Sequence, residues 1–243
     1  MRPQVRDHDR RWGFALIAFV PLQVLYLGLG FSMGPPALDA PADKYRMLVA
    51  DHATLMRWHA LIPLVTFVGL LVPASYALRR RLQDLSADRS EWPDLVVAGS
   101  LLATATVFVG LLVFAVLGLV PVDELSDALI RSTIMVNAFT VWVAGSFAIA
   151  LLAASASMAM LRARPSSPKL AWFGLVAAGL SLLSQLWFAT GDLDGPLFGL
   201  NMLARAMFLA WVAATGVWLL RAGRADLADT APIVEERVAA AMR

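Results

Sequence analysis

The sequence predicts an all-α fold, a polytopic integral membrane bundle of six transmembrane helices, and three observations carry this prediction. Hydrophobic residues make up 59% of the 243 residues and charged residues only 16%, and the mean hydropathy is positive, unlike a soluble globular domain. Six apolar stretches are each long enough to cross the bilayer core, which needs about 20 helical residues. The connections between them are alternately basic and acidic. We therefore expect one membrane domain with both termini in the cytoplasm (N-in/C-in).

The predicted spans follow one another along most of the chain, and none shows the strict alternation of a barrel strand. They cover residues 13–33, 59–78, 95–120, 129–161, 170–190 and 197–220. A cleaved signal peptide is the alternative for the first span, but this apolar run is longer than usual for one. The fourth span is longer than a membrane requires, so it should tilt or protrude. The predicted parts are a cytoplasmic segment 1–12, the transmembrane domain 13–220 and a cytoplasmic tail 221–243.

Charge sets the predicted orientation, because loops rich in arginine and lysine stay in the cytoplasm. The basic residues flank the start of span one and the ends of spans two, four and six: Arg2, Arg6, Arg10, Arg11, Arg79, Arg80, Arg81, Arg89, Arg162, Arg164, Lys169, Arg221 and Arg224. The other three connections carry Asp39, Asp43, Asp51, Asp123, Glu124, Asp127, Asp192 and Asp194. Five or seven crossings would break this alternation. We expect a multi-pass protein of the inner (cytoplasmic) membrane.

The connection before the second span contains a further predicted helix. The chain breaks at Gly34-Pro35-Pro36 and Pro41, and residues 43–52 then form a helix with mixed faces. This helix should either lie in the outer interface or extend the second span outward.

Missing residue types and motifs exclude several functions. The chain has no cysteine, hence no disulfide, thiolate nucleophile or cysteine metal site. It has no Walker loop, nucleophile elbow or HExxH motif. Its two lysines, Lys44 and Lys169, lie outside the spans, so a retinal Schiff base is not expected. No basic surface with interleaved aromatics suggests nucleic acid, and we predict no cofactor and no metal.

Arg205 is the most unusual polar residue at membrane depth. It lies about nine residues into the last span, on the order of 13 Å from the start of that helix. Asn201 precedes it by one turn on the same face. Arg205 either locks the bundle by pairing with Asp192, Asp194 or a helix-end carbonyl, or it belongs to a functional site together with Asn201.

Titratable groups also gather in two outer connections. Asp192 and Asp194 lie in a glycine- and proline-rich turn, where aspartate is usually a turn former or helix cap but can also transfer protons. Asp51 precedes the second span, and His59 opens it. His52 and His59 are two helical turns apart, which makes one shared metal site a weak hypothesis.

The remaining polar and aromatic candidates fall in the middle or outer half of the spans, while the cytoplasmic half is almost wholly apolar. They are Gln23, Tyr26, Asn137, Trp142, Gln185 and Trp187. A cavity, if one exists, should open outward. The alternative for the aromatic residues is an interfacial belt and the bundle core.

Two stretches resemble a known family. Ala50-Asp51-His52-Ala53-Thr54-Leu55-Met56-Arg57 before an apolar span ending in Arg79-Arg80-Arg81, and Leu161-Arg162-Ala163-Arg164-Pro165 before Leu170-Ala171-Trp172-Phe173-Gly174, are similar to the bacterial six-helix membrane proteins of domain-of-unknown-function family 4386. This resemblance implies the fold and no activity. A weaker likeness, to small integral-membrane terpene cyclases, implies aromatic and acidic residues around an isoprenoid.

We expect an outward-facing intramembrane pocket for a small apolar or amphiphilic molecule. As an enzyme, the protein would carry out acid–base, cyclase-type chemistry on an isoprenoid or lipid, with Asp192, Asp194 or Asp51 transferring protons. As a transporter or binding protein, it would hold an anionic headgroup at Arg205. As a structural subunit, it would pack its glycine and alanine faces against another membrane protein, or form a homo-oligomer.

Overall fold

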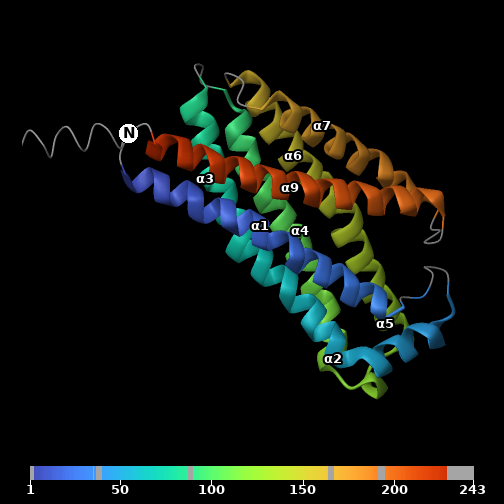
Figure 1. Ribbon diagram of the computed structural model, residues 1–243. Helices are drawn as coiled ribbons and strands as arrows, with labels where there is room; N and C mark the ends of the chain where they lie inside the picture. Colours follow the sequence, from blue (N-terminus) through green and yellow to red (C-terminus); the bar gives the residue numbers. More distant parts are fainter. Residues whose placement is uncertain are drawn as a thin grey trace, which may run out of the picture.

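The computed structural model describes residues 3–34, 36, 40–86, 90–163, 167–190 and 195–228, and these residues form helices and short connections without a strand. Six helical stretches are long and apolar enough to cross a membrane, as the sequence predicted. They are Asp9–Ser32, Ala42–Leu85, Trp92–Leu119, Asp127–Arg162, Pro168–Leu186 and Pro196–Ala222. Figure 1 shows them as one elongated bundle, in which α1 begins and α9 ends at the same end.

Several of these stretches are divided into shorter elements. The elements are α1 (Pro3–Ser32), α2 (Ala42–Thr66), η1 (Phe67–Leu71), α3 (Val72–Leu85), α4 (Trp92–Leu119), η2 (Val122–Glu124), α5 (Asp127–Asn137), η3 (Ala138–Ala144), α6 (Gly145–Arg162), α7 (Pro168–Leu183), η4 (Ser184–Leu186), α8 (Trp187–Thr190) and α9 (Pro196–Ala228). Helix α1 already begins within the predicted segment 1–12, and α9 continues into the predicted tail 221–243.

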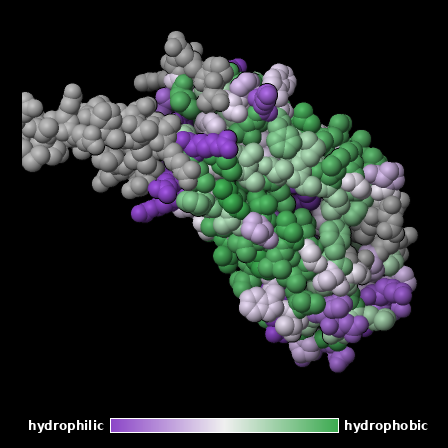
Figure 2. Space-filling model, in the orientation of Figure 1, coloured by the Kyte–Doolittle hydropathy of each residue, from purple (hydrophilic) through white to green (hydrophobic). Residues whose placement is uncertain are grey.

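The bundle leaves much of its apolar surface on the outside. Only 28–44% of the most apolar window of each span is buried inside the protein. Large side chains such as Leu119, Trp172 and Val65 are more than half exposed. Figure 2 shows hydrophobic side chains over the middle of one face and hydrophilic ones towards its two ends. A soluble monomer rarely exposes such a large apolar surface, whereas lipid would cover it.

Glycines allow the helices to approach closely. A Cβ on Gly13 would lie 2.9 Å from the carbonyl oxygen of Gly216, so α1 and α9 meet backbone to backbone. A Cβ on Gly99 would lie 2.7 Å from the backbone nitrogen of Leu152, where α4 crosses α6. Small residues at such crossings are typical of membrane helix packing. At these positions the glycine faces predicted for a partner subunit are used inside the bundle.

Of the two alternatives predicted for residues 43–52, the structure shows a helical extension of the second span, with a kink in it. Helix α2 runs without a loop from Ala42 into the span, but His52 has non-helical backbone angles (φ −125°, ψ 16°). The segment before this kink, residues 42–51, is called the outer arm below. Figure 1 shows the outer arm turning away from the rest of α2 at the end of the bundle.

Two π-helical segments interrupt the long second and fourth spans. The segment η1 follows Pro63, which cannot donate a backbone hydrogen bond within the helix. The segment η3 separates α5 from α6. Such segments carry extra residues per turn and occur frequently at functional sites.

Candidate ligand-binding site

A cavity of about 110 Å³ lies towards the end of the bundle where the outer arm is found. Parts of α1, α2, α4, α5, η3, α8 and α9 contribute to its wall. The lining residues are Tyr26, Leu27, Gly30, Phe31, Met33, Pro36, Leu48, His59, Phe114, Ile134, Asn137, Ala138, Trp142, Trp187 and Phe198. An apolar cavity of about 150 Å³ can hold benzene, so this cavity has room for a slightly smaller apolar group.

Three buried polar side chains line the cavity. Tyr26, His59 and Asn137 are only 5%, 7% and 8% exposed. The His59 Nδ1 and Asn137 Oδ1 atoms are fully enclosed and have no partner among the described residues. Leaving such a group unsatisfied costs about 1–3 kcal/mol. These atoms are therefore suited to receive water or the polar end of a ligand.

Ring contacts hold the imidazole in place. His59 stacks on Tyr26 with ring centroids 4.2 Å apart and meets Phe114 edge to face at 5.6 Å. Gly30 of α1 leaves the space for it, since a Cβ there would lie 2.9 Å from His59 Nε2. The aromatic residues around His59 thus fix its position without using its nitrogens.

Aromatic rings form much of the opposite wall. Phe198, at the start of α9, lies 5.8 Å from Trp142 and 5.4 Å from Trp187 between ring centroids. These rings offer flat apolar surfaces beside the polar trio of Tyr26, His59 and Asn137. No carboxylate from the described part of the chain lines the cavity.

Arg205 lies directly behind Trp142. Its guanidinium carbon is 4.3 Å from the centre of the Trp142 ring, a cation–π contact. Its Nε donates to Asn201 Oδ1 at 3.1 Å, and its Nη2 donates to the backbone oxygens of Val141 and Trp142 at 3.2 and 3.4 Å. A longer contact of 3.5 Å joins Nη2 to Ser146 Oγ. The two carbonyl groups belong to η3, where the altered helical turn presents them to α9.

A second, small cavity of about 30 Å³ lies beside Arg205 and also involves Gln23 and Tyr26. Gln23 donates from Nε2 to Thr66 Oγ1 at 2.7 Å, which ties α1 to α2. Tyr26 and Leu27 line both this cavity and the larger one. Tyr26 is therefore the member of the polar trio that borders both cavities.

An open groove of about 460 Å³ adjoins the cavity, lined in part by the outer arm. Met33, Pro36 and Leu48 line both the groove and the cavity, and Asp51 and His52 line only the groove. Leu48 belongs to the outer arm. The arm thus lies at the boundary between the outer groove and the interior.

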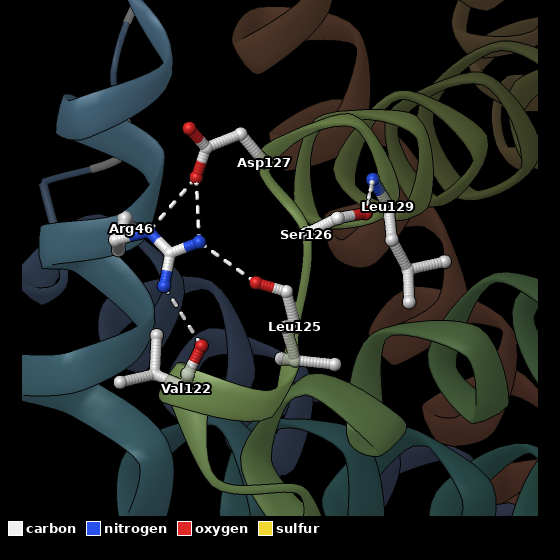
Figure 3. Close-up of polar contacts among 6 residues, drawn as sticks. All are labelled: Arg46, Val122, Leu125, Ser126, Asp127 and Leu129. Carbon is white, nitrogen blue, oxygen red and sulfur yellow. Dashed lines mark hydrogen bonds and ion pairs between the residues drawn. The ribbon is translucent and has the colours of Figure 1, made fainter.

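Arg46 fastens the outer arm to the connection between α4 and α5 (Figure 3). Its guanidinium binds Asp127 Oδ1 from Nε and Nη2 at 2.8 and 2.7 Å. It also donates to the backbone oxygens of Val122 and Leu125 at 2.9 and 2.7 Å. Ser126 caps α5 beside it by accepting from the backbone N–H of Leu129 at 3.3 Å.

The predicted site residues divide into five groups. Five of them, Tyr26, His59, Asn137, Trp142 and Trp187, line the cavity. Gln23, Asn201 and Arg205 adjoin it. Gln185 bonds to Ser181 O and Ser184 Oγ within its own helix and does not line it. Asp51 is exposed on the outer groove, and Asp192 and Asp194 lie outside the described residues.

Several contributors were missed from the sequence. The apolar lining from Leu48, Phe114 and Ile134 has no signal beyond general hydropathy, and the carbonyls that hold Arg205 depend on a π-helical segment. Gly30 could have been identified from the sequence, because a glycine inside an apolar helix often marks a point where another group packs closely against that helix.

The fold and this site define a class: in its described residues, the protein is helical, has six helices long and apolar enough to cross a membrane, and contains a partly open, mostly apolar cavity with unsatisfied polar atoms in its wall. No model of a known protein family, no curated protein and no solved structure matches the chain. Its function is therefore inferred from its own residues.

Proposed function

We propose that this is a multi-pass protein of the cytoplasmic membrane that binds a small amphiphilic molecule in the cavity. The single observation that supports this most is the polar trio of Tyr26, His59 and Asn137, which is buried and lines the cavity. Two of its atoms, His59 Nδ1 and Asn137 Oδ1, lack hydrogen-bond partners in the described part of the chain. A ligand with an apolar body and a polar end would satisfy these atoms and fill the aromatic part of the cavity.

The cavity would face outward in the proposed orientation. The end of α3 and the end of α6, which carry Arg79 and Arg162, lie at one end of the bundle in Figure 1, and the outer arm and the start of α5 lie at the other. Because arginine-rich ends remain in the cytoplasm, the groove and the cavity would be reached from outside.

The absence of native cysteine gives a direct test of orientation, since any single introduced thiol is unique. Met47→Cys places a thiol on the outer arm, and Gln83→Cys places one near the end of α3; both positions are exposed. We expect a membrane-impermeant maleimide to label Met47→Cys in intact cells and Gln83→Cys only after lysis. The reverse pattern would refute the outward orientation.

Ligand binding is tested by native mass spectrometry of gently purified protein, with extraction of any bound small molecule. We expect one co-purifying molecule per chain that is absent from Ala138→Phe, because Ala138 lines the cavity. Val136→Phe is the matched control, since Val136 is close in sequence and 42% exposed. A ligand that survives in Ala138→Phe, or no ligand in any preparation, would count against the cavity.

The described residues support ligand binding. Catalytic turnover of the ligand would also need a proton donor, and no described carboxylate lines the cavity. In the cyclase-type alternative Asp192 or Asp194 supplies it, and Asp192→Asn or Asp194→Asn then abolishes turnover while leaving binding of the co-purifying molecule intact. Unchanged turnover in both variants would exclude these aspartates as the acid.

A further inference from the structure

Arg205 has hydrogen-bonding capacity that the described part of the protein does not use. A guanidinium carries five N–H donors. Those on Nε and Nη2 point to Asn201, Val141, Trp142 and Ser146, whereas the two on Nη1 have no acceptor among the described residues. The small cavity beside Arg205 is where such donors can meet a ligand.

Within the part of the chain that the structure describes, no carboxylate pairs with Arg205. All its acceptors are neutral carbonyl, amide and hydroxyl oxygens. Within the described residues, ion pairs join Arg46 to Asp127 and Arg79 to Asp94, both near helix ends and far from Arg205 along the chain. A cation at membrane depth without an anion is costly, and neutral oxygens offset this cost only in part. The described residues therefore supply no anion for Arg205.

The space beside Arg205 limits the size of any anion bound there. The small cavity of about 30 Å³ corresponds to roughly two or three waters at about 10–15 Å³ each, comparable to one carboxylate group. Tyr26 is part of its wall and of the wall of the large cavity, so a ligand passing Tyr26 would have its apolar body in the large cavity and its charged end beside Arg205.

We infer that the ligand is an amphiphilic anion, an apolar body bearing a carboxylate-sized charged group that binds Nη1 of Arg205 and the Tyr26 hydroxyl. This inference rests on the proposed function and specifies the ligand class. Both groups donate hydrogen bonds, and a carboxylate accepts them through two oxygens without requiring an acceptor in return. A neutral alcohol would leave the charge of Arg205 unbalanced.

The test compares two probes of equal length, hexanoate and 1-hexanol, by calorimetric titration of the full chain in a neutral detergent. Wild-type protein should bind hexanoate at least about tenfold more tightly, since charge-assisted hydrogen bonds are about twice as strong as neutral ones. Arg205→Gln should bring the two affinities close together while 1-hexanol still binds.

Arg57→Gln is the matched control. Arg57 also donates to a backbone oxygen, that of Gly118 at 2.6 Å, but it does not line either cavity. The ratio of the two affinities should stay at its wild-type value in this variant. If Arg205→Gln does not fold, Tyr26→Phe takes its place, and we expect it to lower the hexanoate affinity more than that of 1-hexanol.

The outcomes separate the inference from the proposed function. Equal binding of both probes by wild-type protein, or an unchanged ratio in Arg205→Gln, overturns the anionic ligand but leaves the cavity as a binding site. Binding of neither probe refutes both. If chloride strengthens the binding of 1-hexanol, and Arg205→Gln removes this effect, the charge belongs to a free inorganic anion and the carboxylate-bearing ligand is overturned.

Discussion

Replacing Asn137 with leucine should make the ligand-free protein more stable. Leucine has the same branching as asparagine but no polar atoms, so it removes an enclosed Oδ1 that has no partner among the described residues. Removing an unsatisfied buried group is worth about 1–3 kcal/mol. The two methyl groups are larger than the amide atoms, but Asn137 borders a cavity of about 110 Å³, which limits the cost of overpacking. We expect a net gain of about 1–2 kcal/mol in the free energy of unfolding.

The assay is equilibrium unfolding by sodium dodecyl sulfate in mixed micelles, with and without saturating hexanoate. Wild-type protein should be stabilised by hexanoate, because a ligand that binds only the folded state raises the unfolding free energy. Asn137→Leu should be more stable than wild type without hexanoate and gain less from it. Gln23→Leu is the opposite control: it breaks the 2.7 Å bond to Thr66 and should lose about 1 kcal/mol.

A lower unfolding free energy for Asn137→Leu would refute this reasoning. It would mean that the amide already has a partner in the ligand-free protein and supports the fold. The polar trio would then be part of the structural core, and the main support for a binding site would be lost.

Three further substitutions test other parts of the site. Gly30→Ala should weaken hexanoate binding and lower the free energy of unfolding by about 1–3 kcal/mol, because the new Cβ would lie 2.9 Å from His59 Nε2. Gly28→Ala is its control: a Cβ there has no other atom within 4 Å, so this variant should be as stable as wild type or more stable in the same unfolding assay. His59→Phe should keep the ring contacts and fold stably, yet bind 1-hexanol more weakly in calorimetry. An unchanged affinity for 1-hexanol would show that the imidazole does not take part in binding. Asp127→Asn should cost at most about 1 kcal/mol, as for a partly exposed ion pair, whereas Arg46→Gln also loses two bonds to loop carbonyls and should cost more. Equal losses would show that those carbonyl bonds contribute nothing.

Hydropathy and proline placement predicted the fold well. All six spans lie where the apolar stretches predicted them, and the helix expected after Pro41 begins at Ala42. These features depend on local composition, which a single sequence reports directly. The kink at His52 was not predicted, because histidine is not a helix breaker and its angles depend on the surrounding packing.

The candidate site could be predicted only in part, for a different reason. Polar residues are rare at membrane depth, so Tyr26, Asn137 and Arg205 stood out. The spans are apolar on nearly all sides, and the sequence therefore does not tell which face turns inward. Gln185 was selected by the same depth argument as Asn137, yet it bonds within its own helix. Apolar lining such as Phe114 could not be told apart from lipid-facing residues.

The π-helical segment η3 adds about one residue to the fourth span without changing how α5 and α6 face each other. Each residue of an α-helix advances the chain by about 100° around its axis, so one extra residue in a regular helix would rotate α6 relative to α5 by about that angle. The wider turns of η3 absorb the extra residue locally, and Asn137 before it and Ser146 after it keep the faces that they would have in a regular helix shorter by one residue. A chain with a regular helix here would therefore align with this one only through a one-residue gap within Ala138–Ala144, and an alignment without that gap would pair the wrong faces beyond it.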